Sequence, residues 1–217
     1  MSASEFDPTT APAGRGERLS ADVRREQILA AASVVFGERG YSGGTTDAIA
    51  RQAGVSQAYV VRMFGGKEKL FRASAERAAQ KVVDAFRTTI ADFTGDEAPH
   101  DRTLALSVAY INLVVDRGIL LTLLQLFSLG HDEGLGSLAR QCFLRVYRVV
   151  REDAGLSPEE ANAFFGRGML TTMLLAMRMP DAAGDPAADE LMACTFGETS
   201  TTLIELSRGQ IPLDGGR

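Results

Sequence analysis

Apolar positions recur at helical spacing along most of the chain, and no segment has the strict alternation of a β-strand. The first stripe contains Ile28, Leu29, Ala32, Val35 and Phe36. These residues lie on one side of a helix expected from Ala21 to Arg39. Similar stripes, separated by Gly and Pro residues, continue almost to the C-terminus. The pattern therefore predicts an all-α fold of about nine helices.

Two short helices joined by a tight turn are predicted after the first long helix. Thr45 and Ser56 are good N-caps, because each hydroxyl can accept a hydrogen bond from the first turn of its helix. Gly54 suits the left-handed conformation that the turn requires. Ile49 and Val60 would face a shared interior. This spacing is typical of a helix-turn-helix, whose second helix enters the major groove of DNA.

With its flanking segments, this motif resembles the N-terminal domain of the tetracycline-repressor (TetR) family of one-component bacterial transcription regulators. The resemblance covers roughly Arg24 to Arg77, and includes ILAAASVVFGERGY before the motif and FGGKEKLF after it. Two positions depart from the family pattern. Val61 stands where the family usually has Tyr, and Met63 where it has His or Tyr, and those family residues commonly touch phosphates. The phosphate contacts must then come from other residues or be weaker.

The resemblance implies a set of DNA contacts at the second short helix. Gln57, Ala58 and Tyr59 are expected to face base edges, since Gln can pair bidentately with adenine and the Ala methyl can meet a thymine methyl. Lys67 is expected to touch a phosphate from the start of the following helix. The candidate DNA-binding residues are Thr45, Ser56, Gln57, Ala58, Tyr59, Arg62 and Lys67.

The charge of the chain is unevenly distributed. Residues 15–81 hold 12 Lys and Arg against 7 Asp and Glu, a balance of +5. Residues 82–217 hold 11 against 19, a balance of −8. A basic N-terminal part on an acidic body concentrates the attraction for phosphate at the helix-turn-helix.

Four segments are expected from the composition and the helix signals. Residues 1–20 form a disordered arm, 21–66 the DNA-binding domain, 67–208 a helical ligand-binding and dimerisation domain, and 209–217 a flexible tail. The helix after Gly66 is expected to be long enough to connect the two domains, and His100 is expected in the loop that follows it. The helices expected beyond residue 66 are Lys67 to Phe93, Arg102 to Asp116, Ile119 to Leu129, Leu135 to Ala154, one opened by Ser157 and reaching Met179, and Ala187 to Ser207.

The last two helices are apolar nearly all round, so each must be covered on more than one side. A single-chain core is one explanation. The TetR resemblance implies another, in which these helices pair with those of a second subunit in a homodimer. DNA recognition by two half-sites also favours a twofold dimer. The candidate interface residues are Phe165, Leu203 and Leu206.

Large apolar or amphipathic residues on separate helices of the body could converge on a cavity. Such a set describes either a plain core or a ligand site, and the resemblance favours a site for a small-molecule inducer. The sequence indicates a mainly apolar ligand and does not identify it. The candidate ligand-binding residues are Tyr110, Phe127, Phe143, Tyr147, Met169 and Met173.

Other functions are less consistent with the sequence. It contains no glycine-rich phosphate loop and no metal-spaced cluster, so neither an enzyme nor a metal or cofactor is expected. A cytoplasmic location is expected, with no membrane partner, because no apolar run is long enough to span a bilayer. The preferred interpretation is a ligand-responsive regulator, most simply a repressor, that binds operator DNA. A protein-interaction regulator that has lost DNA binding and a ligand-independent repressor stay open as alternatives.

Overall fold

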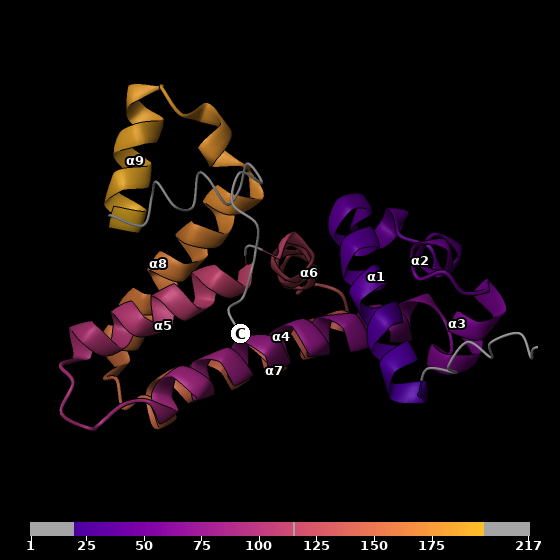
Figure 1. Ribbon diagram of the computed structural model, residues 1–217, viewed down its shortest axis with the longest axis horizontal. Coiled ribbons are helices and arrows are strands. Elements are labelled where there is room, and N and C mark those ends of the chain that lie inside the picture. Colours follow the sequence, from indigo (N-terminus) through magenta and orange to yellow (C-terminus); the bar gives the residue numbers. More distant parts are fainter. Residues whose placement is uncertain (1–19, 115, 198–217) are drawn as a thin grey trace, which may run out of the picture.

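The computed structural model describes residues 20–114 and 116–197, and within them the chain forms nine α-helices and no strand (Figure 1). A π-helical turn, Val149–Asp153, follows α7, and a 3-10 turn, Met179–Ala182, follows α8. The all-α prediction is therefore confirmed. The α-helices are α1 Ala21–Gly43, α2 Thr46–Gln52, α3 Gln57–Phe64, α4 Lys67–Ala91, α5 Pro99–Val114, α6 Arg117–Ser128, α7 Leu135–Arg148, α8 Pro158–Ala176 and α9 Pro186–Phe196.

Some expectations lie outside the described residues. They are the arm at residues 1–20, apart from Ser20, the tail at residues 209–217, and the interface candidates Leu203 and Leu206. The C-terminal half of the helix expected from Ala187 to Ser207 also lies outside them.

Helices α1, α2 and α3 form a head in which the predicted caps are present. Thr45 Oγ1 accepts a hydrogen bond from the Ala48 amide at 3.1 Å, and Ser56 Oγ accepts one from the Tyr59 amide at 3.2 Å. These bonds satisfy amides that have no partner inside their own helices. Gly54 has a φ of 65°, as expected for the turn between α2 and α3. The helix-turn-helix is thus formed by the local signals that predicted it.

The first helix ends in two steps. It was expected to stop at Arg39, and Gly40 does break it, with a φ of 69° and a ψ of 172°. One further turn then continues to Gly43. Tyr41, which follows the break, packs its ring 4.9 Å from that of Phe71 at the start of α4. The break at Gly40 therefore turns an aromatic side chain into the junction between the head and the long helix.

Helix α4 extends from the head to the far end of the body (Figure 1). It was predicted from Lys67 to Phe93 and ends two residues earlier. Its buried side begins with Leu70 and Phe71 and continues through Val82 and Phe86. Head and body thus share one continuous apolar core along α4.

Helix α6 of the body crosses α1 of the head at close range. A Cβ atom at Gly37 of α1 would lie 3.0 Å from Leu121 Cβ, and one at Gly118 of α6 would lie 3.2 Å from Ser33 Cβ. The absence of a side chain at Gly37 and Gly118 lets the two backbones approach. Ser33 Oγ also lies 3.0 Å from Ser74 Oγ of α4. Near Ser33, helix α1 therefore contacts both α4 and α6.

Two helix boundaries in the body differ from the prediction. Helix α5 begins at Pro99, so His100 lies in its first turn and is exposed, rather than in a loop. A proline is well tolerated there, because the first amides of a helix have no acceptor within it. The single helix predicted from Leu135 to Ala154 is α-helical only to Arg148 and closes with the π-helical turn. Gly155, with a φ of 69°, follows this turn and ends the helical segment.

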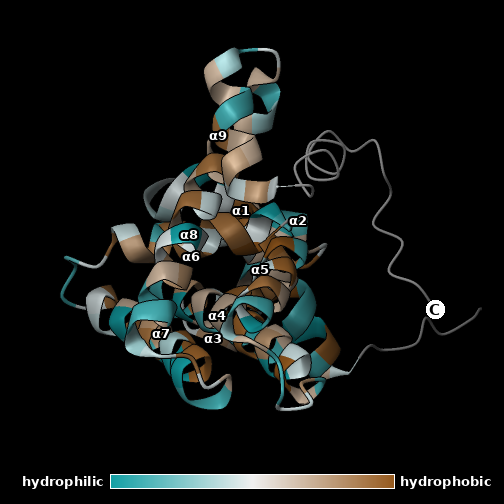
Figure 2. Ribbon diagram, turned by 90° about the vertical axis from the view of Figure 1, so that its left-hand side faces the viewer, coloured by the Kyte–Doolittle hydropathy of each residue, from teal (hydrophilic) through white to brown (hydrophobic). Residues whose placement is uncertain are grey.

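Helix α8 is opened by Ser157, as predicted, and begins with a capping box. Ser157 Oγ accepts from the Glu160 amide at 3.2 Å, and Glu160 Oε2 accepts from the Ser157 amide at 2.7 Å. The helix ends at Ala176, three residues before the expected Met179, where the 3-10 turn begins. Together with the end of α8, α9 projects from one end of the molecule (Figures 1 and 2).

No single described helix is long and apolar enough to cross a membrane. Helices α5 and α6 pass that test only as a pair bent by 102°.

Candidate DNA-binding surface and ligand cavity

Helix α3 presents a polar side to solvent. Val60 and Phe64 are buried on its inner side. Gln57, Ala58 and Arg62 are exposed on the outer side, and Tyr59 is half-buried. Thr45 and Ser56 are also exposed, and Lys67 is half-buried, so no candidate DNA-binding residue lies in the core. This arrangement leaves the outer side of α3 free to enter a groove.

Contacts within the head hold several of these side chains. Gln57 Nε2 donates to Thr46 Oγ1 at 3.1 Å, which links α3 to α2. The Arg62 guanidinium carbon lies 5.1 Å from the centroid of the Tyr59 ring, within the range of a cation–π contact. Ordering of this kind before binding reduces the entropy that DNA association costs.

Lys67 is held at the start of α4. Its Nζ donates to the Ser42 carbonyl at 2.9 Å and lies 5.0 Å from the centroid of the Tyr41 ring. An ammonium group has three N–H donors. The Ser42 carbonyl uses one of them, so two remain for a phosphate. Burial, and then the charges of Glu68 and Asp132, raise the pKa of Tyr41, so its hydroxyl stays neutral beside the lysine.

The two positions that depart from the TetR pattern differ in exposure. Val61 is 42% exposed on α3, where it offers an apolar surface instead of a hydroxyl. Met63 is half-buried and packs against the core. Arg62 on α3 and Lys67 at the start of α4 are the remaining candidates for phosphate contacts.

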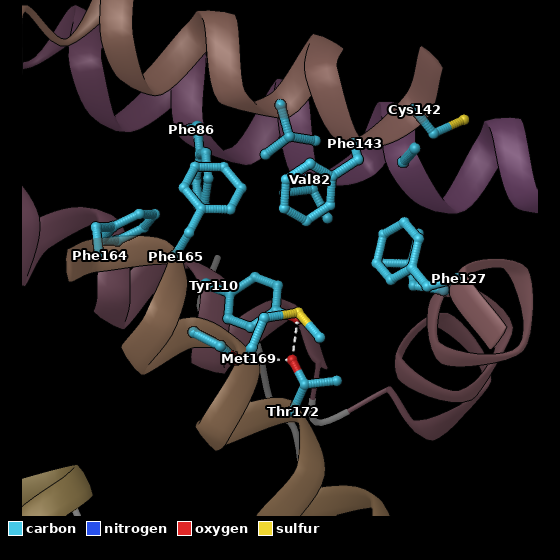
Figure 3. Close-up of a pocket in the computed structure, with 14 residues that line it drawn as sticks. Val82, Phe86, Tyr110, Phe127, Cys142, Phe143, Phe164, Phe165, Met169 and Thr172 are labelled. Atoms are coloured by element: carbon cyan, nitrogen blue, oxygen red, sulfur yellow. Dashed lines mark hydrogen bonds between the residues drawn. The ribbon is translucent and has the colours of Figure 1, made fainter. Parts of the chain in front are cut away.

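The body contains an apolar cavity between α4, α5, α6, α7 and α8 (Figure 3). Its volume is about 70 Å³, and it is partly open to solvent. Helix α8 contributes the most lining side chains. The cavity is lined by Ala79, Val82, Phe86, Tyr110, Leu123, Phe127, Cys142, Phe143, Val146, Phe164, Phe165, Gly168, Met169 and Thr172.

Six aromatic rings surround this space in an unbroken series, which we call the aromatic belt. Successive ring centroids are 5.1 to 6.4 Å apart, within the range of favourable aromatic pairs. Figure 3 shows several of the rings directed toward the shared space. All five helices around the cavity contribute to the belt. In order, its members are Phe127, Phe143, Phe165, Phe164, Phe86 and Tyr110.

One polar pair interrupts the apolar lining. The Tyr110 hydroxyl and Thr172 Oγ1 are 2.7 Å apart, and Thr172 Oγ1 also lies 2.8 Å from the Gly168 carbonyl oxygen (Figure 3). Burial raises the pKa of Tyr110, whereas the hydrogen bond to Thr172 opposes that shift. The Tyr110 phenol is therefore neutral at ordinary pH.

The structure brings four of the six ligand-binding candidates together. Tyr110, Phe127, Phe143 and Met169 line the cavity. Tyr147 lies behind the lining and packs its ring 5.6 Å from that of Phe165. Met173 is outside the cavity, 42% exposed on the outer side of α8. Whether any of these residues binds a ligand stays a prediction.

Several lining residues were not predicted. Val82 and Phe86 belong to α4, whose apolar stripe was interpreted only as packing of a connecting helix. Phe164 was not a candidate for any site. The signal that could have found Val82 and Phe86 is their spacing of one helical turn on the buried side of α4.

Phe165, an interface candidate, lies within the subunit. It lines the cavity and contacts the rings of Phe143 and Tyr147. A different set of apolar side chains on α8 and α9 is open to solvent. They are Leu170, Met173, Met177 and Leu191, which are 36% to 57% exposed.

The described residues contain no cluster of three or more His, Cys, Asp or Glu side chains that could hold a metal ion. Cys142 is buried in the cavity wall, and Cys194 is exposed.

A helix-turn-helix head, joined by one long helix to a helical body with its own cavity, defines a class of transcription regulators. Residues 28–74 match the sequence model of the family described as bacterial regulatory proteins, tetR family. The head of the chain therefore matches the TetR family of transcriptional regulators, as its sequence motifs predicted.

A similar protein is the HTH-type transcriptional activator FasR of Mycolicibacterium smegmatis (strain ATCC 700084 / mc(2)155). It is 42% identical over 82 residues, which are 36% of this chain and 37% of FasR. The match thus spans little more than a third of that relative.

Solved structures share the fold over nearly the whole chain. The fatty acid degradation regulator FadR from Bacillus halodurans aligns with a TM-score of 0.61 and 19% identity, over 86% of this chain and 99% of that one. The transcriptional regulator FadR from Bacillus subtilis, solved in complex with stearoyl-CoA, aligns with a TM-score of 0.59 and 19% identity over the same shares. A TetR-like regulator from Rhodococcus sp. RHA1 aligns with a TM-score of 0.57 and 20% identity, over 89% and 98%.

Proposed function

We propose that this chain is a homodimeric regulator that binds double-stranded operator DNA and responds to a small, mainly apolar ligand held in the cavity of the body. Helix α3 enters the major groove, where Gln57, Ala58 and Tyr59 contact bases. Arg62 and Lys67 contact phosphates. The solvent-facing side of α3 supports this assignment, as does the positive balance of residues 15–81. The competing hypothesis of a head that has lost DNA binding depends on Val61 and Met63 alone.

Dimerisation is proposed through the outer sides of α8 and α9. Leu170, Met173, Met177 and Leu191 give these helices an exposed apolar surface, which a second subunit can bury. A twofold axis there would present two copies of α3 to two half-sites roughly 34 to 36 Å apart.

The ligand is proposed to occupy the aromatic belt. A concave space with apolar walls and one polar pair is the usual construction of a small-molecule site. The FadR structure from B. subtilis was solved with stearoyl-CoA. The acyl chain of that molecule is apolar, like the ligand proposed for this cavity. The likeness of the two proteins concerns the fold alone.

The observation that carries the proposal is the double role of α4 and α6. Helix α4 contributes Val82 and Phe86 to the cavity and Phe71 to the head. Helix α6 contributes Leu123 and Phe127 to the cavity and contacts α1 through Gly118. A ligand that displaces either helix therefore shifts the head, and with it the spacing of the two α3 helices.

The direction of regulation is proposed as repression, in which the dimer covers its operator and the ligand releases it. The relative FasR is named an activator, which favours the opposite direction as a second candidate. Transcription in vitro from the operator-bearing promoter, with and without the protein, separates the two.

Reciprocal binding tests the mechanism. A ligand that weakens operator binding by a coupling of about 1 to 3 kcal/mol lowers its affinity some 5- to 150-fold, and the operator must weaken the ligand by the same factor. We would measure ligand affinity by calorimetry with and without operator, and operator affinity by titration against the chain's own upstream DNA. Equal ligand affinities in the two states contradict the coupling and leave a ligand-independent repressor.

A further inference from the structure

The lining of the cavity restricts the charge of its ligand. None of the 14 lining residues is Asp, Glu, Lys, Arg or His. An ionised group drawn into this space would lose its hydration without gaining a partner, which is costly. The part of the ligand that enters the aromatic belt is therefore neutral.

The polar groups of the cavity are few. Tyr110 and Thr172 supply its two hydroxyls, 2.7 Å apart. The other side-chain heteroatoms, the thiol of Cys142 and the thioether of Met169, form only weak hydrogen bonds. Polar recognition inside the cavity thus depends on the Tyr110–Thr172 pair.

The protons of this pair can be assigned from its surroundings. Thr172 Oγ1 lies 2.8 Å from the Gly168 carbonyl, which can only accept, so the single Thr172 proton is donated there. The Tyr110 hydroxyl must then donate its own proton to Thr172 Oγ1. Both protons are used within the protein, and only oxygen lone pairs remain. The pair can accept a further hydrogen bond and cannot donate one.

We infer that the cavity selects a neutral, mainly apolar molecule that carries a hydrogen-bond donor, a hydroxyl or an N–H, directed at the Tyr110–Thr172 oxygens. This inference rests on the proposed function of the cavity as the ligand site. It names a ligand class: alcohols, phenols and amides with an apolar body are favoured, whereas ethers of the same shape and carboxylates are disfavoured.

Three para-substituted alkylbenzenes test the inference directly. 4-Octylphenol has a donor, 4-octylanisole keeps the oxygen without the proton, and 4-octylbenzoic acid is ionised at neutral pH. Calorimetric titration of the full chain should give the phenol an affinity roughly three- to tenfold above that of the anisole, the usual effect of one hydrogen bond. The benzoate should bind more weakly than either.

Substitution of Thr172 should reverse the preference. Thr172→Val keeps the shape of the side chain and removes the acceptor of the Tyr110 proton, so the tyrosine can donate to the ligand. The affinity for the anisole should then rise, and the ratio of phenol to anisole affinity should fall to about one or below. The double variant Tyr110→Phe, Thr172→Val should bind both with no preference. Thr171→Val is the matched control, because Thr171 is buried next to it and does not line the cavity.

The outcomes separate the two proposals. Equal binding of phenol and anisole to the unaltered chain, or a ratio that Thr172→Val leaves unchanged, overturns the donor requirement and leaves the ligand cavity in place. If none of the three compounds binds the unaltered chain or the variants, the cavity is part of a core, and the ligand half of the proposed function fails with this inference.

Discussion

At the scale of single residues, the head uses polar side chains for more than one purpose. Thr45 and Ser56 cap helices on the surface expected to meet DNA. Lys67 is the clearest case, since its ammonium group binds the Ser42 carbonyl and stacks on Tyr41 while remaining half-exposed. Such residues position the head and can contact phosphate with the donors that remain.

We predict that Lys67→Ala weakens all DNA sequences about equally and lowers the salt slope of binding by roughly one unit, because a phosphate contact releases about one counterion and carries no base information. Fluorescence anisotropy over a range of salt concentrations measures both effects. Lys81→Ala is the control, since Lys81 lies about 21 Å further along the same helix. A slope that is unchanged in Lys67→Ala would show that the lysine serves only Ser42 and Tyr41.

Single residues also show what the sequence could and could not predict. Caps and turn glycines act over three or four residues, so Thr45, Gly54, Ser56 and the helix start at Ser157 were predicted without knowledge of the fold. Membership of the cavity depends on the rotation of each helix about its axis. Met169 and Thr172 face the cavity, whereas Met173, one residue beyond Thr172 and about 100° further round the helix, faces solvent.

At the scale of elements, the crossing of α1 and α6 is the tightest junction between head and body. Apolar periodicity predicted that both helices exist, but it holds no information on which helices cross. The role of Gly37 was therefore not predicted. Only the position of a neighbouring helix shows whether a glycine within a helix is required for close packing or merely tolerated. Here Leu121 Cβ would be 3.0 Å from an added methyl group.

Substitution of Gly37 tests this junction. Gly37→Ala gains about 0.5 to 1 kcal/mol in helix propensity and loses about 1 to 3 kcal/mol by overpacking against Leu121, so a net loss of up to about 2.5 kcal/mol is expected. Gly166→Ala, on α8 with nothing within 4 Å of the added atom, should only gain. Thermal unfolding at matched protein concentration compares the two variants. Equal stabilisation by both substitutions would mean that α6 moves to accommodate the added methyl group without cost.

At the scale of the whole molecule, helices α8 and α9, which carry exposed apolar side chains, lie on the opposite side of the molecule from α3 (Figure 1). The sequence predicted that the C-terminal helices are too apolar for single-sided packing, and α8 indeed divides its apolar residues between the cavity and solvent. Phe165 and Leu170 are on opposite sides of this division.

We predict that Leu170→Arg converts the proposed dimer to monomers. In a single subunit Leu170 is 41% exposed, so the fold should tolerate the change. At an apolar interface each arginine would be an unpaired buried charge, costing several kcal/mol, or roughly 100-fold or more in the dimer dissociation constant. Sedimentation measures the change. Leu144→Arg on α7, where Leu144 is 46% exposed, is the control and should stay dimeric; a dimer unaffected by Leu170→Arg places the interface elsewhere.

The close approach of Gly37 and Gly118 also limits how freely this regulator can be recombined. A DNA-binding head from another family member, grafted at residue 66, would bring its own side chain to the position of Gly37, where α6 leaves no space for one. A chimaeric sensor built from this body would therefore accept a new head only from donors with a glycine at that position. A donor with a larger residue there would have to supply its own α6 as well. Compatibility of head and body thus depends on the contact between α1 and α6 at Gly37 and Gly118, which are neither proposed DNA-binding residues nor residues that line the cavity.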